Sequence, residues 1–428
     1  MLQITRHRLS NGMKLLVIDL PHLHSVELGM FVKAGPRFEG MGDLGLSHFT
    51  EHMFFRGTRG VAATFALHAE VERLGSPLNA LTSRDYSQYY FALPPRHLER
   101  GCALFSEIML HPTFESIDVE RQIILEEYLG DLNEHGEDIN PENHSRAMLW
   151  PDSTLGMNIL GTEANIRRFS QEDLFRHHKR HYTGENSVVY FAGACRAEQA
   201  VALAEKYFAR YPAGEALPTA HDLGQLHGPR YRFINNDDSQ DHLSISFLAP
   251  SYTAPNYLAM VALQNILAEG MSSRLQWNLC ERLGMVYDLD AGLESYFDTG
   301  VFDIEASASP DKLVPLFQEI VHILRDLREQ PVDPHELEKA RERYRMGAEF
   351  ACDNPSYLAT WMASTELYLP VKAPEAYLEQ IDRLTASDLQ ATAREVFHPS
   401  RMVAVITGRP GKNERKQLVK LIDGDWAL

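Results

Sequence analysis

The chain has 428 residues, of which 44% are hydrophobic and 23% are charged, and its formal charge at pH 7 is −18. A chain of this length is too long for one ordinary hydrophobic core, so we expect at least two domains. The negative charge argues against nucleic acid as a partner. No stretch reaches the ~18 apolar residues of a membrane span, and the N-terminal residues contain no apolar signal-peptide core. A cytoplasmic protein with no membrane contact is the expectation.

The first elements in chain order are predicted to be β-strands. Asn11-Gly12 is a strong hairpin turn, and strand-like residues follow it at 15–18. Apolar residues alternate with other residues between 26 and 32, as in a half-buried strand. Helical segments are then expected around 44–56, 64–75, 94–110 and 115–134.

One segment of the chain occurs twice. Residues 169–194 align without gaps on residues 384–409, so that Ser170 matches Thr385. Each copy has the pattern of a capped helix, a turn, a strand and a glycine. A constant offset over a whole segment seldom arises by chance. We therefore predict two homologous α+β halves, each an antiparallel β-sheet with helices packed on one face.

The boundaries of the halves follow from a linker-like stretch. Residues 212–229 are rich in proline and glycine, which is typical of a linker. The N-terminal half would then span 1–211 and the C-terminal half 230–428. The second half also begins with β alternation, from Leu243 to Phe247.

The residues that carry chemistry lie in the helix predicted at 44–56. His48 and His52 are four residues apart and share one helix face, so they can offer two imidazole nitrogens to one metal ion. Glu51 projects beside them, where it can take a proton from an attacking water. Two such histidines suit zinc, and a catalytic zinc needs a third ligand. The alternative is a histidine-rich helix face that binds no metal.

Two glutamates further along the chain share a face of the helix predicted at 115–134. Glu120 and Glu127 are two helical turns apart, and Glu126 lies about 100° round the helix from Glu127. A solvated acidic helix is the better interpretation of any such pair considered alone.

Together, HFTEH at 48–52 and ERQIILEE at 120–127 resemble the inverted-zincin peptidases of the M16 family, which includes pitrilysin, insulysin and mitochondrial processing peptidase. The resemblance also covers NGMKLLV at 11–17, HPTF at 111–114 and GMSSRLQWNLCERLGMVY at 270–287. Chain length and the twofold repeat resemble the M16B branch, whose chains hold two halves.

The resemblance implies a role for each residue of the two motifs. His48, His52 and Glu127 would bind zinc. Glu51 would act as the general base, and Glu120 would support the ligands without touching the metal. The second half has no HxxEH motif, so one zinc ion per chain is expected.

The resemblance also implies substrate-binding residues in both halves. Asn79 and Ala80 would lie on an edge strand beside the metal, where an extended peptide can add by main-chain hydrogen bonds. Arg282 would fix the peptide backbone, and Tyr287 would donate to the developing oxyanion. The alternatives are an ordinary turn or strand end for the first pair, and a surface arginine and a core tyrosine for the second.

A further cluster, His177, His178 and His181, lies in an HHKRH stretch without a carboxylate partner. We expect these histidines to form a solvated helix face rather than a second metal site.

The expected function is that of a zinc-dependent endopeptidase that cuts peptides or unfolded segments inside a closed chamber. In the family, a catalytic half faces a non-catalytic half, which in two-half chains belongs to a partner. A homodimer is the simplest such arrangement, and a heterodimer with an M16-like partner is the other. Two rival functions stay open: a maturation peptidase dedicated to one ribosomal peptide, acting with a partner chain, and a non-catalytic structural subunit.

Overall fold

The structure is a computed structural model that describes residues 3–227, 230–237, 239–424 and 426. The chain forms two compact units, each assembled from stretches that are separated in the sequence. Unit 1 comprises Met1–Gly130, Met157–Thr219 and Ala348–Pro374, and unit 2 comprises Asp131–Gly156, Ala220–Gly347 and Glu375–Leu428.

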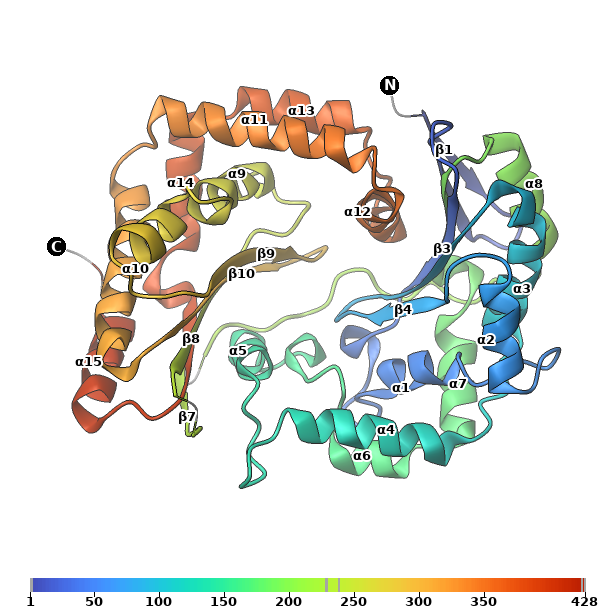
Figure 1. The fold of residues 1–428 in the computed structure, drawn as a ribbon, viewed down its shortest axis with the longest axis horizontal. Helices are drawn as coiled ribbons and strands as arrows, with labels where there is room; N and C mark the ends of the chain where they lie inside the picture. Colours follow the sequence, from blue (N-terminus) through green and yellow to red (C-terminus); the bar gives the residue numbers. More distant parts are fainter. Residues whose placement is uncertain (1–2, 228–229, 238, 425, 427–428) are drawn as a thin grey trace. The chain divides into compact units, whose positions relative to one another are not determined.

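Unit 1 is built on a six-stranded sheet with the order β1-β2-β6-β3-β5-β4. Neighbouring strands are antiparallel except for β2 and β6, which run parallel. Strand β4 forms one edge of this sheet (Figure 1). The strands are β1 (Gln3–Arg8), β2 (Lys14–Asp19), β3 (Val26–Val32), β4 (Asn79–Thr82), β5 (Ser87–Leu93) and β6 (Ser187–Gly193).

Helices cover both faces of this sheet, because every residue of β3 and of β6 is buried and neither face can be left to water. One face packs against α3 and α8, and the other packs against α12. The helices are α1 (Leu46–Met53), α2 (Thr64–Glu72), α3 (Leu98–Leu110), α4 (Ile117–Gly130), α6 (Glu163–Arg168), α7 (Gln171–His181), α8 (Ala197–Tyr207) and α12 (Pro355–Tyr368).

Unit 2 contains a five-stranded sheet with the order β7-β11-β8-β10-β9, in which β7 and β11 are parallel. This order repeats the order of β2, β6, β3, β5 and β4 in unit 1, with the parallel pair at the same place. The strands are β7 (Tyr231–Ile234), β8 (Asp241–Ala249), β9 (Leu289–Ser295), β10 (Gly300–Ala308) and β11 (Met402–Thr407).

The main core of unit 2 lies between one face of this sheet and a layer of helices that includes α9, α10 and α14. Helix α5 packs on the opposite face, beside β8 and β11. The helices are α5 (Pro141–Leu149), α9 (Tyr257–Ala268), α10 (Leu313–Glu329), α11 (Pro334–Ala351), α13 (Pro374–Arg383), α14 (Ala386–Val396) and α15 (Lys412–Asp423). Among the described residues, no helix is both long and apolar enough to cross a membrane.

The repeated segment has the same structure in both units. Ser170 caps α7 and Thr385 caps α14, each in a capping box with an aspartate three residues later. Each helix leads into a buried strand that ends at a glycine with positive φ, Gly193 at 134° and Gly408 at 144°. The predicted α+β fold with two homologous halves is confirmed. Two details differ from the expectation. Each sheet contains one parallel pair of strands, and each sheet carries a helix on its second face.

Two helices pack away from the half in which their sequence lies. Helix α5 precedes the predicted linker at 212–229 but packs in unit 2, and α12 follows the linker but packs on β2, β3 and β6 of unit 1. The boundaries 1–211 and 230–428 follow from the linker-like stretch rather than from compactness, and they stay a prediction.

The predicted linker is bound at two points within its described residues, 212–227. Asn186 donates to the Glu215 carbonyl oxygen at 2.8 Å within unit 1, and the backbone N–H of His221 donates to Asp298 at 3.0 Å within unit 2. The part of this stretch up to Thr219 is therefore docked on unit 1, and the part from Ala220 is docked on unit 2.

Candidate metal centre

The helix that carries the two predicted histidine ligands is held at its start by a buried carboxylate. Helix α1 begins after Gly45, which adopts φ 91° and has no side chain to cap the helix. Glu39 takes over the cap, because its carboxylate accepts hydrogen bonds from the backbone N–H groups of Gly45 at 2.9 Å and Ser47 at 2.6 Å. A Cβ at Gly45 would lie 2.3 Å from the Leu160 carbonyl oxygen, so a larger residue would displace the turn.

The apolar side of α1 packs against α4 and sets the position of the third predicted ligand. Phe49 and Met53 are buried in a cluster that includes Ile124 of α4. Glu127 follows Ile124 by three residues, which is nearly one helical turn. The packing of the two helices therefore brings Glu127 beside the histidines of α1.

The predicted ligands His48, His52 and Glu127 converge in space. The Glu127 Oε2 atom lies 3.6 Å from Nε2 of His48 and 3.7 Å from Nε2 of His52. Tetrahedral zinc with bonds of about 2.0–2.1 Å places its ligand atoms roughly 3.4 Å apart. The two nitrogens and one oxygen therefore fit a zinc ion with an open fourth position. No other group of three metal-ligating side chains this close together occurs in the described part of the chain.

The two histidines have different electrostatic environments. Burial, with a contribution from His52, lowers the pKa of His48 to about 3, so this ring is neutral and has a free lone pair at neutral pH. Burial also acts to lower the pKa of His52. The hydrogen bond to Glu120 and the nearby carboxylates outweigh that effect, so the pKa of His52 is raised. The negative surroundings that raise it also favour a cation between the rings.

Glu120 holds the second ring from behind. Its Oε2 atom lies 3.0 Å from Nδ1 of His52, which directs Nε2 of that ring toward Glu127. Arg56 donates from Nε to the other oxygen of Glu120. A carboxylate on the distal nitrogen of a ligating histidine fixes the tautomer and orientation of the ring. Glu120 is thus placed for the supporting role that the sequence predicted.

Glu51 lies beside the triad but outside it. Its Oε2 atom accepts a hydrogen bond of 2.6 Å from the Thr82 hydroxyl. Burial raises the pKa of Glu51, although the Thr82 hydrogen bond and His52 act in the opposite direction. A raised carboxyl pKa is the property that a general base needs near neutral pH.

Asn79 and Ala80 lie on β4, the edge strand whose last residue, Thr82, reaches Glu51. Asn79 is exposed and Ala80 packs partly on the core. Strand β4 is paired with β5 on one side, and its other side is the edge of the sheet. The structure thus places both residues on an edge strand that reaches Glu51, and their role in substrate binding stays a prediction.

Arg282 and Tyr287 belong to unit 2, whereas the triad belongs to unit 1. Arg282 ends a π-helix over Gln276–Arg282, a rare structure that is frequent at functional sites. Its guanidinium donates to Asn278 at 3.0 Å and to Glu319 at 2.9 Å. The Tyr287 side chain is 98% exposed, so it is not the core tyrosine of the alternative interpretation.

The expectation of a solvated HHKRH helix face was wrong. His177 and His181 are 4% and 2% exposed, and burial lowers the pKa of His181 to about 4. His181 bonds the Lys33 carbonyl oxygen at 2.7 Å, and His178 bonds the Met109 carbonyl oxygen at 2.8 Å. These are neutral core histidines that hold α7 to its neighbours, and the described residues form no second metal site around them.

Three residues that the sequence analysis did not select contact the site. Thr82 binds Glu51, Arg56 binds Glu120, and Glu39 caps α1. Alternation along β4 places Thr82 on the same face as Ala80. Nothing local in the sequence shows that this face meets α1.

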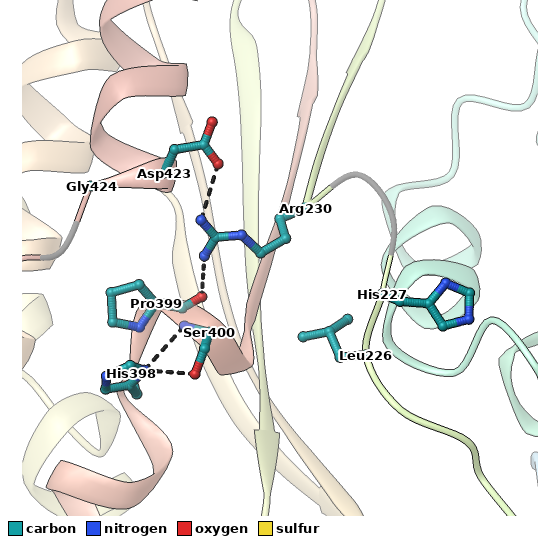
Figure 2. A pocket seen from close by; sticks show the side chains of 8 residues that line it. All are labelled: Leu226, His227, Arg230, His398, Pro399, Ser400, Asp423 and Gly424. Atoms are coloured by element: carbon teal, nitrogen blue, oxygen red, sulfur yellow. Dashed lines mark hydrogen bonds and ion pairs between the residues drawn. The ribbon is translucent and has the colours of Figure 1, made fainter.

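The pocket of about 420 Å³ in unit 2 is a separate feature. Figure 2 shows that Arg230, its central cation, is already joined to Asp423 and to the Pro399 carbonyl oxygen. His398 and Ser400 are bonded to each other. His227 bonds Asp152 outside the pocket, so the charged and polar groups of this pocket already have partners and offer no argument for a ligand.

Comparisons with known proteins find relatives that match most of the chain. The family model "Insulinase (Peptidase family M16)" matches residues 14–163, which contain the triad, and "Peptidase M16 inactive domain" matches residues 168–344. A Rickettsia bellii protein named "Uncharacterized zinc protease" is 31% identical over 405 residues, covering 93% of this chain and 96% of that protein. An Arabidopsis thaliana protein named as a probable mitochondrial-processing peptidase subunit beta is 27% identical, covering 91% and 75%.

Solved structures share the fold. A protease from Helicobacter pylori has a TM-score of 0.85 at 22% identity, covering 95% of this chain and all of that one. A Pseudomonas fluorescens protein described as a peptidase M16 inactive domain has a TM-score of 0.84 at 21% identity, covering 96% and 99%. With a relative above 30% identity over nearly the whole chain and two adjoining family models, this chain belongs to the M16 peptidase family.

Proposed function

We propose that this protein is a zinc-dependent endopeptidase that hydrolyses peptides or unfolded polypeptide segments inside a closed chamber. The observation that carries the proposal is the convergence of His48, His52 and Glu127 within bonding range of one ion. The names of the relatives support zinc as that ion.

The residues divide the chemistry among them. Bound zinc would polarise the scissile carbonyl and lower the pKa of a water. Glu51 would take a proton from the attacking water and pass it to the leaving amine. Tyr287, if brought to the site, would donate its phenol proton in a hydrogen bond to the developing oxyanion.

An extended substrate fits the edge strand. The backbone groups of β4 that face away from β5 can pair with a peptide main chain, which demands little of the peptide sequence. In a folded protein most extended strands are already paired within its own sheets, and exposed sheet edges are usually protected. Peptides and unfolded segments are therefore the proposed substrates.

The direct test is incubation with a peptide library, with and without a zinc chelator, read by mass spectrometry. We expect chelator-sensitive internal cleavage of many peptides, and no cleavage by the matched Glu51→Gln variant. Cleavage of a single peptide class that needs an added partner chain would favour the dedicated maturation peptidase. Absence of any chelator-sensitive cleavage would favour the non-catalytic subunit.

The proposed metal content is one zinc ion per chain, because one HxxEH motif is present. Elemental analysis of the purified protein should give about one zinc per chain. The His48→Ala, His52→Ala double variant should lose both metal and activity. Full zinc occupancy in that double variant would overturn the assignment of the ligands.

We infer further that the active unit is a cytoplasmic homodimer in which each triad works with Tyr287 of the partner subunit. The exposure of this tyrosine supports the inference. A twofold homodimer would contain two equivalent composite sites without a second gene. A heterodimer with an M16-like partner is the alternative assembly.

Mixing two inactive variants tests the composite site. Glu51→Gln and Tyr287→Phe chains should each be nearly inactive alone. Heterodimers of the two should recover activity, because one of their two composite sites keeps both residues. Purified heterodimers without recovery would overturn the shared site, and heterodimer activity can be compared with a Glu51→Gln, Tyr287→Phe double variant as the matched inactive control.

A further inference from the structure

The carboxylate of Glu51 is held from the edge strand as well as from its own helix. Thr82 is the last residue of β4 and is 7% exposed. Its hydroxyl donates to the Glu51 Oε2 atom at 2.6 Å, across 31 residues of sequence. A hydrogen bond to a carboxylate is about twice as strong as one between neutral groups.

The Thr82 hydroxyl has a second hydroxyl group beside it. The Ser87 Oγ atom lies 3.4 Å from the Thr82 Oγ1 atom, on the strand that pairs with β4. Tyr89 follows Ser87 on β5, and its phenol oxygen lies 2.7 Å from that of Tyr182. All four hydroxyl residues are buried. At 3.4 Å the contact between Ser87 and Thr82 is long for a hydrogen bond between hydroxyl groups, so the position of the Thr82 hydroxyl depends on where β4 lies.

Strand β4 contacts Glu51 through Thr82 and also has an edge that can pair with a peptide. The Thr82 side chain meets the base, while its strand has a free edge on which a peptide can pair. Holding a glutamate side chain such as that of Glu51 in a single rotamer costs considerable conformational entropy. A peptide that orders β4 would also order the Thr82 hydroxyl, and the hydrogen bond from this hydroxyl would then restrict the rotamers of Glu51.

We propose that Thr82 is a positioning residue that couples peptide binding along β4 to the orientation of the general base Glu51. This proposal rests on the proposed function of the site. Peptide pairing along the whole of β4 fixes the strand, the strand fixes the Thr82 hydroxyl, and the hydroxyl fixes the carboxylate. Binding of peptide residues distant from the scissile bond then appears in kcat as well as in KM.

Two substitutions at this position separate the hydroxyl from the shape of the side chain. Thr82→Val keeps the shape and removes the hydroxyl, and we expect kcat to fall about 10- to 100-fold, the range for a hydrogen bond to a charged group. KM and zinc content should stay within about twofold of the wild type. Thr82→Ser retains the hydroxyl and should restore most of kcat.

Thr50→Val is the matched control for loss of a buried threonine hydroxyl. The Thr50 hydroxyl donates to the Leu46 carbonyl oxygen within α1 and makes no contact with Glu51 among its described hydrogen bonds. This variant should keep its kcat. Equal losses of kcat in Thr50→Val and Thr82→Val would indicate a general structural effect and overturn the proposal.

A double-mutant cycle tests whether Thr82 acts through the base. Adding Thr82→Val to Glu51→Gln should cause little further loss of kcat, because the group that the hydroxyl positions is already absent. Losses that multiply would show that the two residues act independently and would overturn the proposal. A second cycle with Thr82→Ala covers the case in which the valine variant misfolds, and loss of folding in both would assign Thr82 to stability instead.

Peptide length provides an independent readout. In the wild type, shortening a substrate at the end that pairs with β4 should lower kcat. In Thr82→Val the same shortening should change KM but not kcat. If kcat of this variant depended on peptide length as strongly as kcat of the wild type, the coupling would be overturned. Wild-type protein without chelator-sensitive cleavage would instead refute the proposed function, so the two failures are distinguishable.

Discussion

Replacement of Glu120 by glutamine tests whether the site is ordered from outside the ligand set. Burial acts to raise the pKa of Glu120, but its hydrogen bonds to His52 and Arg56 outweigh burial and lower that pKa. The carboxylate is therefore charged at neutral pH. Glutamine keeps the shape but has one acceptor oxygen and an amide that can only donate. The glutamine oxygen can accept a hydrogen bond from His52 or from Arg56 but not from both. Its NH₂ group would then face the N–H donor of the other residue.

The size of the effect follows from this geometry. An outer partner of a ligating histidine typically contributes 10- to 100-fold to metal affinity, which is about 1.4–2.7 kcal/mol. We expect the upper half of this range. The Glu120 side chain is 7% exposed, and the side chain of Arg56, which loses its neutralising partner, is 18% exposed. Little water is therefore available to replace the lost interactions.

The assay is a zinc titration in competition with a chromogenic chelator, with far-UV circular dichroism as a check on folding. Glu126→Gln is the matched control, because Glu126 lies on the same helix, is exposed, and is not among the clustered ligands. Glu120→Gln should bind zinc roughly 30- to 100-fold more weakly, and Glu126→Gln should match the wild type. Zinc affinity of Glu120→Gln within twofold of the wild type would refute the argument that His52 is oriented from behind.

Three further predictions concern the ligand, the base and the buried histidines. Glu127→Gln should weaken zinc binding far more than Glu126→Gln, and a metal titration with the opposite order would show that the helical phase is wrong. Glu51→Gln should retain zinc and peptide binding but lose about 100-fold or more in turnover, so near-normal turnover would reassign the base. Burial lowers the pKa of His178 and His181 from 6.5 to about 4. The unfolded chain therefore takes up these protons first as the pH falls, and stability present above pH 6.5 is lost down to about pH 4. Each histidine contributes up to roughly 3 kcal/mol to that loss, and urea unfolding of zinc-free protein with a flat profile in this window would contradict it.

The local elements of the fold could be predicted because their signals are local. The helices expected at 44–56 and 115–134 occur at Leu46–Met53 and Ile117–Gly130. Both are shorter than predicted, because capping contacts determine where a helix begins and ends. The docking of α5 and α12 on sheets far along the chain could not be predicted. Periodicity shows that a helix has an apolar face, but it does not show which sheet covers that face.

The candidate site divides in the same way. The spacing of His48 and His52 predicts a shared helix face, and the resemblance to a family singled out Glu127. Thr82 escaped notice because its contact with Glu51 is a tertiary one between a strand and a helix. The HHKRH stretch was misjudged because polarity was equated with exposure, whereas a neutral imidazole that bonds a backbone carbonyl can be buried.

The geometry of the metal centre is set by the protein itself. Glu39 fixes the start of α1, Glu120 fixes the ring of His52, and Thr82 fixes the carboxylate of Glu51. Each of these contacts joins α1 to a different segment of unit 1, so the helix is constrained at its beginning, at Glu51 and at His52. Glu127 is the most exposed ligand, with 47% of its side chain accessible. The rings of His48 and His52 are mostly buried, so an ion that binds there would spend little binding energy on ordering them.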